Sequence, residues 1–538
     1  MFPRVNLPSP PLAGLTVLAL FFPAGAVGAA PDALRADADK DKRPNIILFY
    51  VDDMGWQDTS VKFHTSGTIY NRRYITPNME TLASRGVKFT QAYSAASICQ
   101  PARYALMSGL LPAASGYTYN GAGDTTATIR PPKFDPPPID QLNTLPRALQ
   151  ALGYETIHIG KWHIMGTHPD YSRNILAAGF NRKIAANDAG QPGSFLGTEN
   201  FGEPGKFHVP GLEAYHGKDI YLTEAITRES NKEIARCAAV GKPFFLYLAH
   251  YAIHKPIQLD RRFACHYDGR EDGGHFIDND IERSYATMIE GMDKSLGDIM
   301  NQLKALGIDE ETLIVFSSDH GGLTFTDRGP SAYPEGTFPP TGIAVSNQSH
   351  NYPLRYGKSW LYEGGVRVPM IVSWASPNAA NPVQKNYPVR VAATEDRPVS
   401  QLDFFPTLVK AAGGTPPGSV HGHDISHYFS GSRGSDRPAM FLWHQPHYRP
   451  DHNIPHLTAM RFGKWKIVHR IESATWELYD LSTDIHECRN LAPTHPRELA
   501  RFSRMMVREL EKAGARHPTR TSDGKEIRPV PTPATPLQ

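Results

Sequence analysis

Four apolar runs, each followed by charged or imidazole side chains, constrain the fold of this chain most. The first run, Asn45–Val51, leads directly into Asp52 and Asp53. Continuous apolar runs of this length are typical of strands buried on both faces of a parallel sheet. The other runs lie at 156–159, 244–248 and 312–316. Segments with helical periodicity lie at 145–152, 281–306 and 398–412. Strands that alternate with helices predict an α/β domain with a large, mostly parallel central sheet flanked by helices.

The pattern changes near residue 430, where we expect a second and smaller subdomain. Glycine and serine at 431–435 predict the boundary. Segments 458–469 and 476–481 predict strands of an antiparallel sheet, and 497–513 predicts a closing helix. The polar residues that follow are expected as a flexible tail. The expected units are a main domain at 44–430, a C-terminal α+β subdomain at 431–515 and a tail at 516–538.

The first 30 residues predict a secretory signal. Arg4 precedes the apolar run Leu15–Phe22, and small residues follow at 24–30. This order is typical of a signal peptide, and the run is too short to span a bilayer. We therefore expect export to the periplasm or the extracellular space and a mature chain that begins near Pro31. No later run is long and apolar enough to predict a membrane span.

Charge and cysteine content exclude several classes of protein. The 56 basic and 54 acidic residues leave a formal charge of +2, which argues against binding nucleic acid or a membrane surface by bulk charge. Four cysteines in 538 residues exclude a disulfide scaffold. If the protein is exported, Cys237 and Cys265 could form a disulfide bridge, and Cys488 would then be the cysteine left over.

Acidic side chains follow two of the expected strands. Asp52 and Asp53 follow the first run, and Asp319 and His320 follow the run at 312–316. Ligands of open α/β sheets bind at the carboxyl ends of the strands, so we expect these side chains to lie together. Carboxylates are preferred by hard divalent cations, and without a metal or a proton they would repel one another. The pattern predicts a metal site here.

Basic side chains and one cysteine motif complete the candidate site. Lys161, His163, His254 and Lys358 could surround an anion. The sequence Cys99-Gln-Pro-Ala-Arg103 places a proline where first helical turns often have one. A helix N-terminus favours a bound anion and an activated thiol. The alternative is that Cys99 is a small buried apolar residue at the start of a helix.

Seven segments of this chain, taken in their order along the sequence, resemble the type I sulfatase family of the alkaline-phosphatase-like superfamily. The resemblance covers most of residues 44 to about 495. It rests on Arg43–Gly55, Thr76–Asn78, Cys99–Gly109, Gly160–His163, Ala252–Pro256, Ser318–Gly321 and Gly357–Pro369. It implies an alkaline-phosphatase-like fold and a sulfuric ester hydrolase.

The resemblance also implies catalytic roles. Cys99 would be oxidised to formylglycine by a formylglycine-generating or anaerobic converting enzyme, and the hydrated aldehyde would attack sulfur. Arg103 would orient this diol, and Lys161 and His163 would contact it. Two further residues would bind sulfate and stabilise or protonate the leaving alkoxide. These are His254 and Lys358.

The implied metal is calcium, with magnesium as the alternative. Its ligands would be Asp52, Asp53, Cys99, Asp319 and His320. Many relatives carry asparagine where this chain has His320, and calcium prefers oxygen to nitrogen. His320 is therefore expected either to bind the metal or to touch the nucleophile without binding it.

Other features bear on the substrate and the fold. We expect a sulfated polysaccharide or oligosaccharide as substrate. The loops at 115–141 and 186–218 and the segment 443–448 could frame a sugar site or be plain surface.

Glu363-Gly-Gly and Arg367 are expected to be structural, with glycines that adopt unusual backbone angles. The alternative functions are a phosphoester or phosphonate hydrolase and an inactive carbohydrate-binding relative; the intact cysteine motif argues against both.

Overall fold

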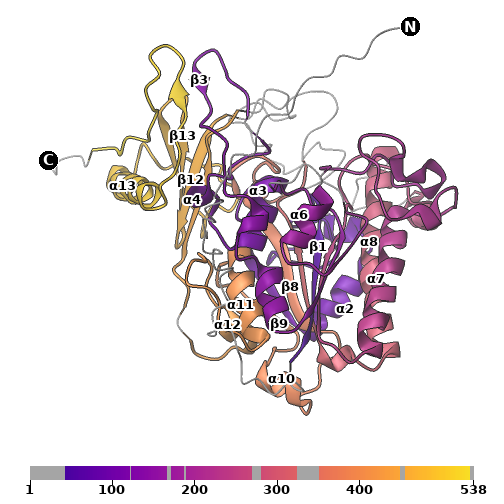
Figure 1. Cartoon of the computed structure of the whole chain (residues 1–538). Coiled ribbons are helices and arrows are strands. Elements are labelled where there is room, and N and C mark those ends of the chain that lie inside the picture. Colours follow the sequence, from indigo (N-terminus) through magenta and orange to yellow (C-terminus); the bar gives the residue numbers. More distant parts are fainter. Residues whose placement is uncertain are drawn as a thin grey trace, which may run out of the picture.

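Figure 1 shows the computed structural model of the chain. The residues that it describes are 43–68, 70–121, 123–166, 171–186, 189–269, 280–323, 351–434, 436–448 and 455–533. The expected signal segment at 1–30 therefore lies outside the described residues. No helix within the described ranges has the length and apolar character needed to cross a membrane.

A nine-stranded sheet forms the centre of the larger domain (Figure 1). The four expected apolar runs are neighbouring parallel strands in the order β7, β1, β6 and β4. Their bounds are β1 (Asn45–Val51), β4 (Glu155–Gly160), β6 (Phe244–Ala249) and β7 (Thr312–Ser318). Every residue of β6 and β7 is buried, as expected for strands covered on both faces. The mostly parallel α/β sheet is confirmed.

Five further strands extend this sheet, and the apolar pattern predicts none of them. They are β2 (Val87–Tyr93), β5 (Arg182–Ile184), β8 (Arg367–Trp374), β9 (Ala393–Glu395) and β10 (Val399–Ser400). β8 runs antiparallel to both β7 and β2. The helix expected at 398–412 begins late: β10 pairs with β2, and the helix α11 spans Phe404–Ala411. The pairing of β10 with a distant strand overrides the local helical pattern.

Helices cover both faces of the sheet, and β1 shows how the two cores divide. Ile47, Phe49 and Val51 pack into one core with α2, α7 and α8, whereas the alternate residues of β1 pack into the other with α3, α5 and α11. The bounds are α2 (Pro77–Arg85), α3 (Cys99–Ser108), α5 (Leu145–Ala151), α6 (Tyr171–Ala177), α7 (Leu222–Ala239) and α8 (Asp280–Ala305). α5 and α8 confirm two of the expected helices.

Short helices and turns fill the connections. They are α1 (Tyr70–Arg73), α4 (Pro112–Ser115), α9 (Glu363–Val366), α10 (Pro382–Asn386), α12 (Ser426–Ser430), η3 (Ile139–Gln141), η4 (Gly197–Gly202), η5 (Glu213–Tyr215), η6 (Arg261–Tyr267), η7 (Asp309–Glu311) and η8 (Gln401–Asp403).

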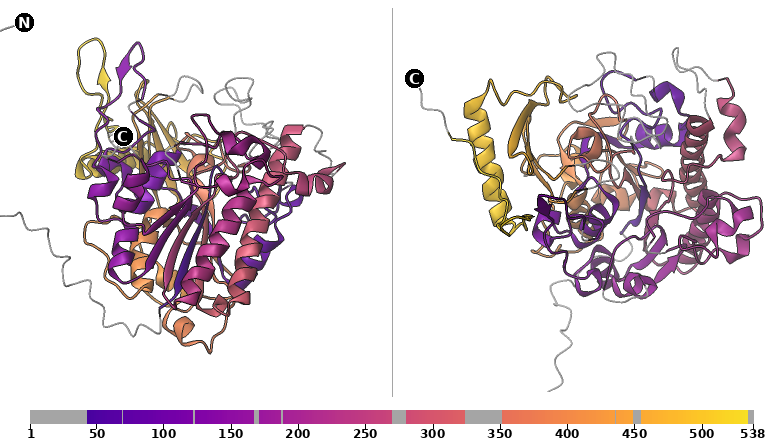
Figure 2. Two further views of the ribbon diagram at one scale, coloured as in Figure 1. Left: turned by 45° about the vertical axis from the view of Figure 1, so that its right-hand side comes forward. Right: turned by 90° about the horizontal axis from the view of Figure 1, so that it is seen from above.

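A separate antiparallel sheet follows in the C-terminal part, as expected, and lies at one side of the larger domain (Figure 2). Its strands are β11 (Met440–Gln445), β12 (Leu457–Phe462), β13 (Trp465–Arg470) and β14 (Thr475–Asp480). The helix α13 (Pro496–Lys512) packs Phe502 and Met506 against it. The expected strand segment at 458–469 forms two strands around Gly463, whose φ of +58° suits a tight turn. The boundary at 430/431 stays a prediction.

Part of the C-terminal segment forms a strand that pairs with a loop of the larger domain. β15 (Thr519–Arg520) pairs with β3 (Ile129–Arg130), so this part of the expected flexible tail is attached to the loop at 115–141.

Cys237 is buried and Cys265 is exposed, and all four cysteines are free thiols. The Cys237–Cys265 bridge is therefore not formed.

Candidate active site

The carboxyl ends of β1 and β7 bring the predicted acidic residues together. Asp319 accepts a hydrogen bond from the Asp53 backbone N–H at 3.1 Å through Oδ1. The Asp319 N–H in turn donates to the Val51 carbonyl at 3.0 Å. Asp52, Asp53, Asp319 and the adjacent His320 are all buried. Parallel pairing of two strands that are distant in the sequence thus builds one acidic cluster.

Cys99 lies at the edge of this cluster, at the first residue of α3. The thiol is 1% exposed, and its sulfur is 3.2 Å from His320 Nε2. Burial raises the pKa of the Cys99 thiol, but Lys161, Lys358 and His320 outweigh burial and hold it well below its ordinary value. A structural apolar cysteine would keep a raised pKa. The surroundings of Cys99 therefore favour an anion at this position.

Arg103 lies one helical turn after Cys99 and is fully buried. Its Nε donates to Asp319 Oδ2 at 3.1 Å, and its Nη2 is 3.4 Å from Asp52 Oδ1. Its Nη1 donates to the Lys161 carbonyl at 3.1 Å and to the Tyr247 hydroxyl at 3.3 Å. Arg103 therefore fixes the carboxylates and the Lys161 backbone. Tyr247 was missed by the sequence because it lies within the apolar run of β6.

Lys161 and Lys358 each pair with one carboxylate. Lys161 Nζ is 2.6 Å from Asp52 Oδ2, and Lys358 Nζ is 2.6 Å from Asp53 Oδ1. Burial raises the pKa of Asp52 well above its ordinary range despite Lys161. For Asp53, Lys358 and two imidazoles outweigh burial and lower the pKa. With Arg103, three basic side chains face the three acidic ones and offset part of their repulsion. The raised pKa of Asp52 still favours a proton there, and the expected need for a metal or a proton stays a prediction.

Two neutral imidazoles complete the cluster. Burial lowers the pKa of His163 to about 4, and the neighbouring Cys99 opposes this shift. Burial, with Lys358 in support, lowers the pKa of His254 to about 3. His254 Nδ1 donates to the Lys255 carbonyl at 2.9 Å, and Nε2 is 3.6 Å from Asp53 Oδ2. All ten predicted site residues therefore lie in one cluster, of which nine are buried and His163 is partly exposed.

The backbone at two of these residues is strained. Asp53 has a φ of +61° and His163 has a φ of +52°, although neither is glycine. Such conformations persist only where the surrounding structure holds them, and they concentrate at functional sites.

The donor set fits a metal ion. One donor atom from each of Asp52, Cys99, Asp319 and His320 lies within 4.8 Å of the others. Asp52 Oδ1 is buried and accepts no hydrogen bond within the described residues; besides its ion pair with Arg103 at 3.4 Å, it keeps lone pairs that a metal ion could use. Carboxylate oxygens suit a hard divalent cation. The geometry alone does not distinguish calcium from magnesium.

Glu363 and its two following glycines are structural. Glu363 is buried and pairs with Lys466 of β13 at 2.9 Å, which joins the two domains. A Cβ on Gly364 would lie 2.1 Å from the Tyr356 carbonyl oxygen, and one on Gly365 would lie 1.9 Å from that of Trp360. Neither glycine has a positive φ. Close backbone approach, rather than the expected unusual angles, requires glycine here.

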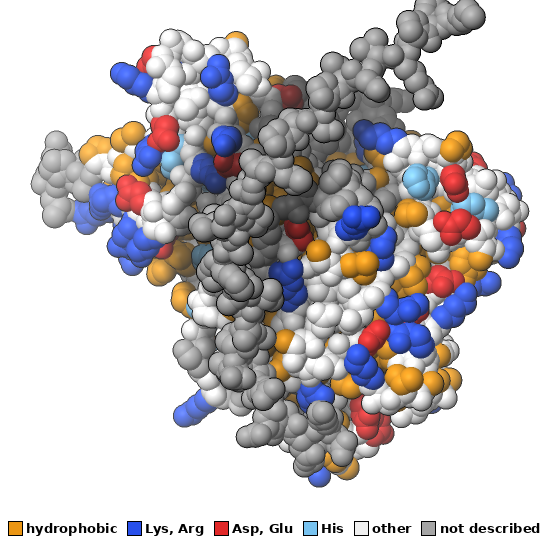
Figure 3. Space-filling model, in the orientation of Figure 1, with side chains coloured by type: hydrophobic (Ala, Val, Ile, Leu, Met, Phe, Trp, Pro, Cys, Tyr) orange, Lys and Arg blue, Asp and Glu red, His pale blue; other side chains and the backbone are white. Residues whose placement is uncertain are grey.

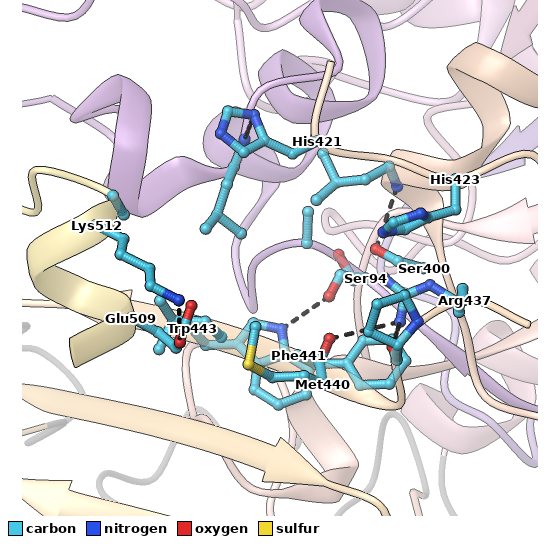
Figure 4. Close-up of a pocket in the computed structure, with 16 residues that line it drawn as sticks. Ser94, Ser400, His421, His423, Arg437, Met440, Phe441, Trp443, Glu509 and Lys512 are labelled. Carbon is cyan, nitrogen blue, oxygen red and sulfur yellow. Dashed lines mark hydrogen bonds and ion pairs between the residues drawn. The ribbon is translucent and has the colours of Figure 1, made fainter. Parts of the chain in front are cut away.

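The segment 443–448 does not offer the open aromatic surface expected for a sugar site. Trp443 is 2% exposed and His447 is 1% exposed. His447 stacks on Tyr119 of the loop at 115–141, with 5.0 Å between ring centroids. This segment therefore packs between the domains. A cavity of about 230 Å³ lies nearby, between β11, α13 and the loop at 421–423 (Figure 4).

The surface shows no large region of one charge on the face in Figure 3, where basic and acidic side chains are interspersed. This distribution agrees with the small net charge of +2.

Comparisons with known proteins agree with the site. The family model "Sulfatase" matches residues 44–414, and the model "N-sulphoglucosamine sulphohydrolase, C-terminal" matches 354–515. A sulfatase of Formosa agariphila is 27% identical over 520 residues, which cover 85% of this chain and 86% of the relative. The dog N-acetylgalactosamine-6-sulfatase is 28% identical over 473 residues, with 85% and 77% covered.

A solved structure gives the same result. The crystal structure of Ps i-CgsB is similar with a TM-score of 0.64 and 26% identity, over 87% of this chain and 92% of that one. That protein has also been solved in complex with k-i-k-neocarrahexaose. The chain therefore belongs to the sulfatase family of the alkaline-phosphatase-like superfamily and is a sulfuric ester hydrolase.

Proposed function

We propose that this protein is an exported sulfatase that hydrolyses sulfate esters of a carbohydrate, with a formylglycine made from Cys99 as its nucleophile. The observation that carries the proposal is the surroundings of Cys99. It begins α3, contacts His320 and His163, and lies among cations that lower its pKa. These surroundings favour negative charge at position 99, which suits a nucleophile for a sulfate ester.

The residues around Cys99 have different roles in the proposed ester hydrolysis. The hydrated aldehyde supplies an oxygen nucleophile for sulfur and later releases sulfate by returning to the aldehyde. His163 is neutral at pH 7 because its pKa is about 4, so it can accept a proton beside this group. Arg103 holds Asp319 and Asp52 in place by its hydrogen bond and ion pair to them.

Calcium is our proposed metal, with magnesium as the alternative. It would be held by Asp52, Asp53, Asp319 and the group at position 99, with His320 either as a ligand or as a contact of the nucleophile. A divalent cation at this place supplies Lewis-acid polarisation of a sulfate oxygen.

Lys358 is the residue best suited to the leaving oxygen. Asp53 and Cys99 outweigh burial and raise its pKa, so it stays cationic and can stabilise developing negative charge. His254 is uncharged, and its Nδ1 proton is already donated to Lys255. It can protonate the leaving group only after gaining a proton, which a bound sulfate favours because an adjacent anion raises an imidazole pKa.

The proposed substrate class rests on the relatives. One is named an N-acetylgalactosamine-6-sulfatase, and the similar crystal structure was solved with an oligosaccharide. We propose a sulfated polysaccharide or oligosaccharide for this chain. Export is proposed from the signal-like segment at 1–30, and sequencing of the mature N-terminus tests it: the result should begin near Pro31, and a retained Met1 would contradict export.

The test of the function compares esters. The protein from its own host is given para-nitrophenyl sulfate, a sulfated oligosaccharide and the matched phosphate and phosphonate esters. We expect sulfate release by the wild type, none by Cys99→Ala, and full activity of Cys237→Ala, which removes a buried thiol outside the site. Preferred hydrolysis of the phosphorus esters, or turnover by Cys99→Ala, would overturn the proposal. Binding of the oligosaccharide without turnover would favour an inactive relative.

A further inference from the structure

Alternate side chains of β11 and the residues after it contact the larger domain around Cys99. Trp443 Nε1 donates to the Ser94 carbonyl at 2.9 Å (Figure 4). Gln445 accepts a hydrogen bond from the Ser97 hydroxyl at 3.0 Å. His447 Nε2 is 2.8 Å from the Thr118 hydroxyl. Residues two apart on a strand share one face, so Trp443 and Gln445 place one face of β11 along the segment 94–97 that leads into Cys99.

Gln445 makes a second hydrogen bond to the larger domain. Its Nε2 donates to the Ser359 carbonyl at 2.9 Å. Ser359 directly follows Lys358, and Ser97 lies two residues before Cys99. A carbonyl can only accept, so the amide nitrogen must face Ser359 and the amide oxygen must face Ser97. One side chain from the C-terminal subdomain therefore links the segments that carry Cys99 and Lys358.

A backbone hydrogen bond closes the same triangle. The Ser359 N–H donates to the Ser97 carbonyl at 2.7 Å. Ser97 and Ser359 are 0% exposed and Gln445 is 3% exposed, so water does not replace a lost partner. Ser359 has a φ of +71°, a strained conformation that its surroundings must hold.

We propose that Gln445 is a positioning residue that fixes Lys358 relative to the nucleophile at position 99. The proposal rests on the proposed function of these two residues. Among the described residues, the side-chain hydrogen bonds of Gln445 go to Ser97 and Ser359, so it acts on the cluster through these two residues. Displacement of a reacting group by about 1 Å can cost roughly 10²-fold in rate, so the loss of this link should appear in kcat.

The main variant is Gln445→Met, which keeps the length of the side chain and removes both hydrogen bonds. The matched control is His444→Leu on the opposite face of the same strand. His444 is buried, and its two ring nitrogens bond to Thr458 and to the Arg516 carbonyl, away from Cys99. Each variant loses two hydrogen bonds of a buried side chain, so both should lower the unfolding temperature. Formylglycine content is measured for each variant, and kcat is expressed per converted site.

We expect kcat for para-nitrophenyl sulfate to fall by roughly 10- to 100-fold in Gln445→Met with KM little changed, and to stay near wild type in His444→Leu. Ser97→Ala should lose less, and the double variant Gln445→Met/Ser97→Ala should lose no more than Gln445→Met, because the two residues share one link. Ser97→Ala removes only a hydroxyl, so it keeps the test decisive if Gln445→Met does not fold.

Amide hydrogen exchange gives a second measurement that does not need activity. The Ser359 amide should exchange faster in Gln445→Met and at the wild-type rate in His444→Leu. Equal effects of the two variants on kcat and on Ser359 exchange would overturn the positioning role and leave Gln445 merely structural. A wild-type protein without sulfatase activity would instead overturn the proposed function, while the exchange result would still report on the link.

Discussion

His320 Nε2 lies 3.2 Å from the sulfur of Cys99, while Nδ1 of the same ring lies 2.9 Å from the Gly321 carbonyl oxygen. Because Nδ1 must donate to that carbonyl, Nε2 is the atom that faces the cluster. Burial lowers the pKa of His320, but Asp319 and Cys99 outweigh it and raise the pKa. One nitrogen is thus placed to serve a metal ion or the nucleophile.

Substitution of His320 separates these two roles. An asparagine offers an amide oxygen, which a hard cation prefers to nitrogen. We expect His320→Asn to bind calcium at least as tightly as the wild type, and His320→Ala to lose roughly 10- to 100-fold in calcium affinity. Calcium titration of both variants checks this. Equal and unchanged affinities would show that His320 contacts only the nucleophile.

Removal of the metal should lower activity and stability together. The proposed ligands are buried in the folded protein and are not assembled in the unfolded chain, so binding stabilises the fold. We expect chelation with EGTA to lower both the sulfate release and the unfolding temperature, and calcium to restore them better than magnesium. The metal proposal fails if chelation changes neither quantity.

The roles of His254 and its neighbour can be compared directly. His254→Ala should lower kcat for sugar sulfates, which have poor leaving groups, by roughly 10²-fold more than for activated aryl sulfates. Lys255→Ala is the control, because its side chain is exposed and its carbonyl still accepts from His254. Rates are measured over a series of leaving groups. Equal losses across the series would remove His254 from proton transfer.

The buried contact between the domains predicts a pH dependence of stability. Glu487 accepts from the Glu363 N–H at 2.7 Å and lies 3.1 Å from Lys466. Burial raises the pKa of Glu487 to about 7, Lys466 opposes the shift, and Glu363 adds to it. The folded protein holds this proton to a higher pH than the unfolded chain. The stabilisation is therefore complete below the unfolded pKa and is lost as the pH rises through about 7.

The variant Glu487→Gln has no titratable side chain at this position. It therefore tests the predicted direction of the change in stability with pH. Relative to the variant, the wild type should lose free energy of unfolding between about pH 5 and about pH 8. Urea unfolding at both pH values measures the difference, and Glu511→Gln, an exposed glutamate of α13, is the control. A difference between wild type and Glu487→Gln that does not change with pH would refute the shift.

The sequence predicts the strands that are buried on both faces and misses those defined by pairing. The run Asn45–Val51 is apolar throughout because helices cover both of its faces. β10 has only Val399 and Ser400, and it becomes a strand because β2 lies beside it. Local pattern carries no signal for such a contact.

The same limit applies to the site. Motifs predict which residues gather, because strand ends of a parallel sheet meet at one edge. They do not predict that Lys161 and Lys358 pair with Asp52 and Asp53. Nor do they predict Gln445, which lies 348 residues from its partner Ser97 and carries no motif.

The most direct test of the central claim is mass spectrometry of the tryptic peptide Phe89–Arg103 from protein made in its own host. We predict that Cys99 has lost its sulfur and two hydrogens and gained one oxygen as an aldehyde, with one further water in the hydrate, while the peptide that carries Cys237 keeps its thiol. Conversion should be absent when the protein is made in a host without a converting enzyme. A Cys99 that is found only as the thiol in protein from its own host would contradict the account.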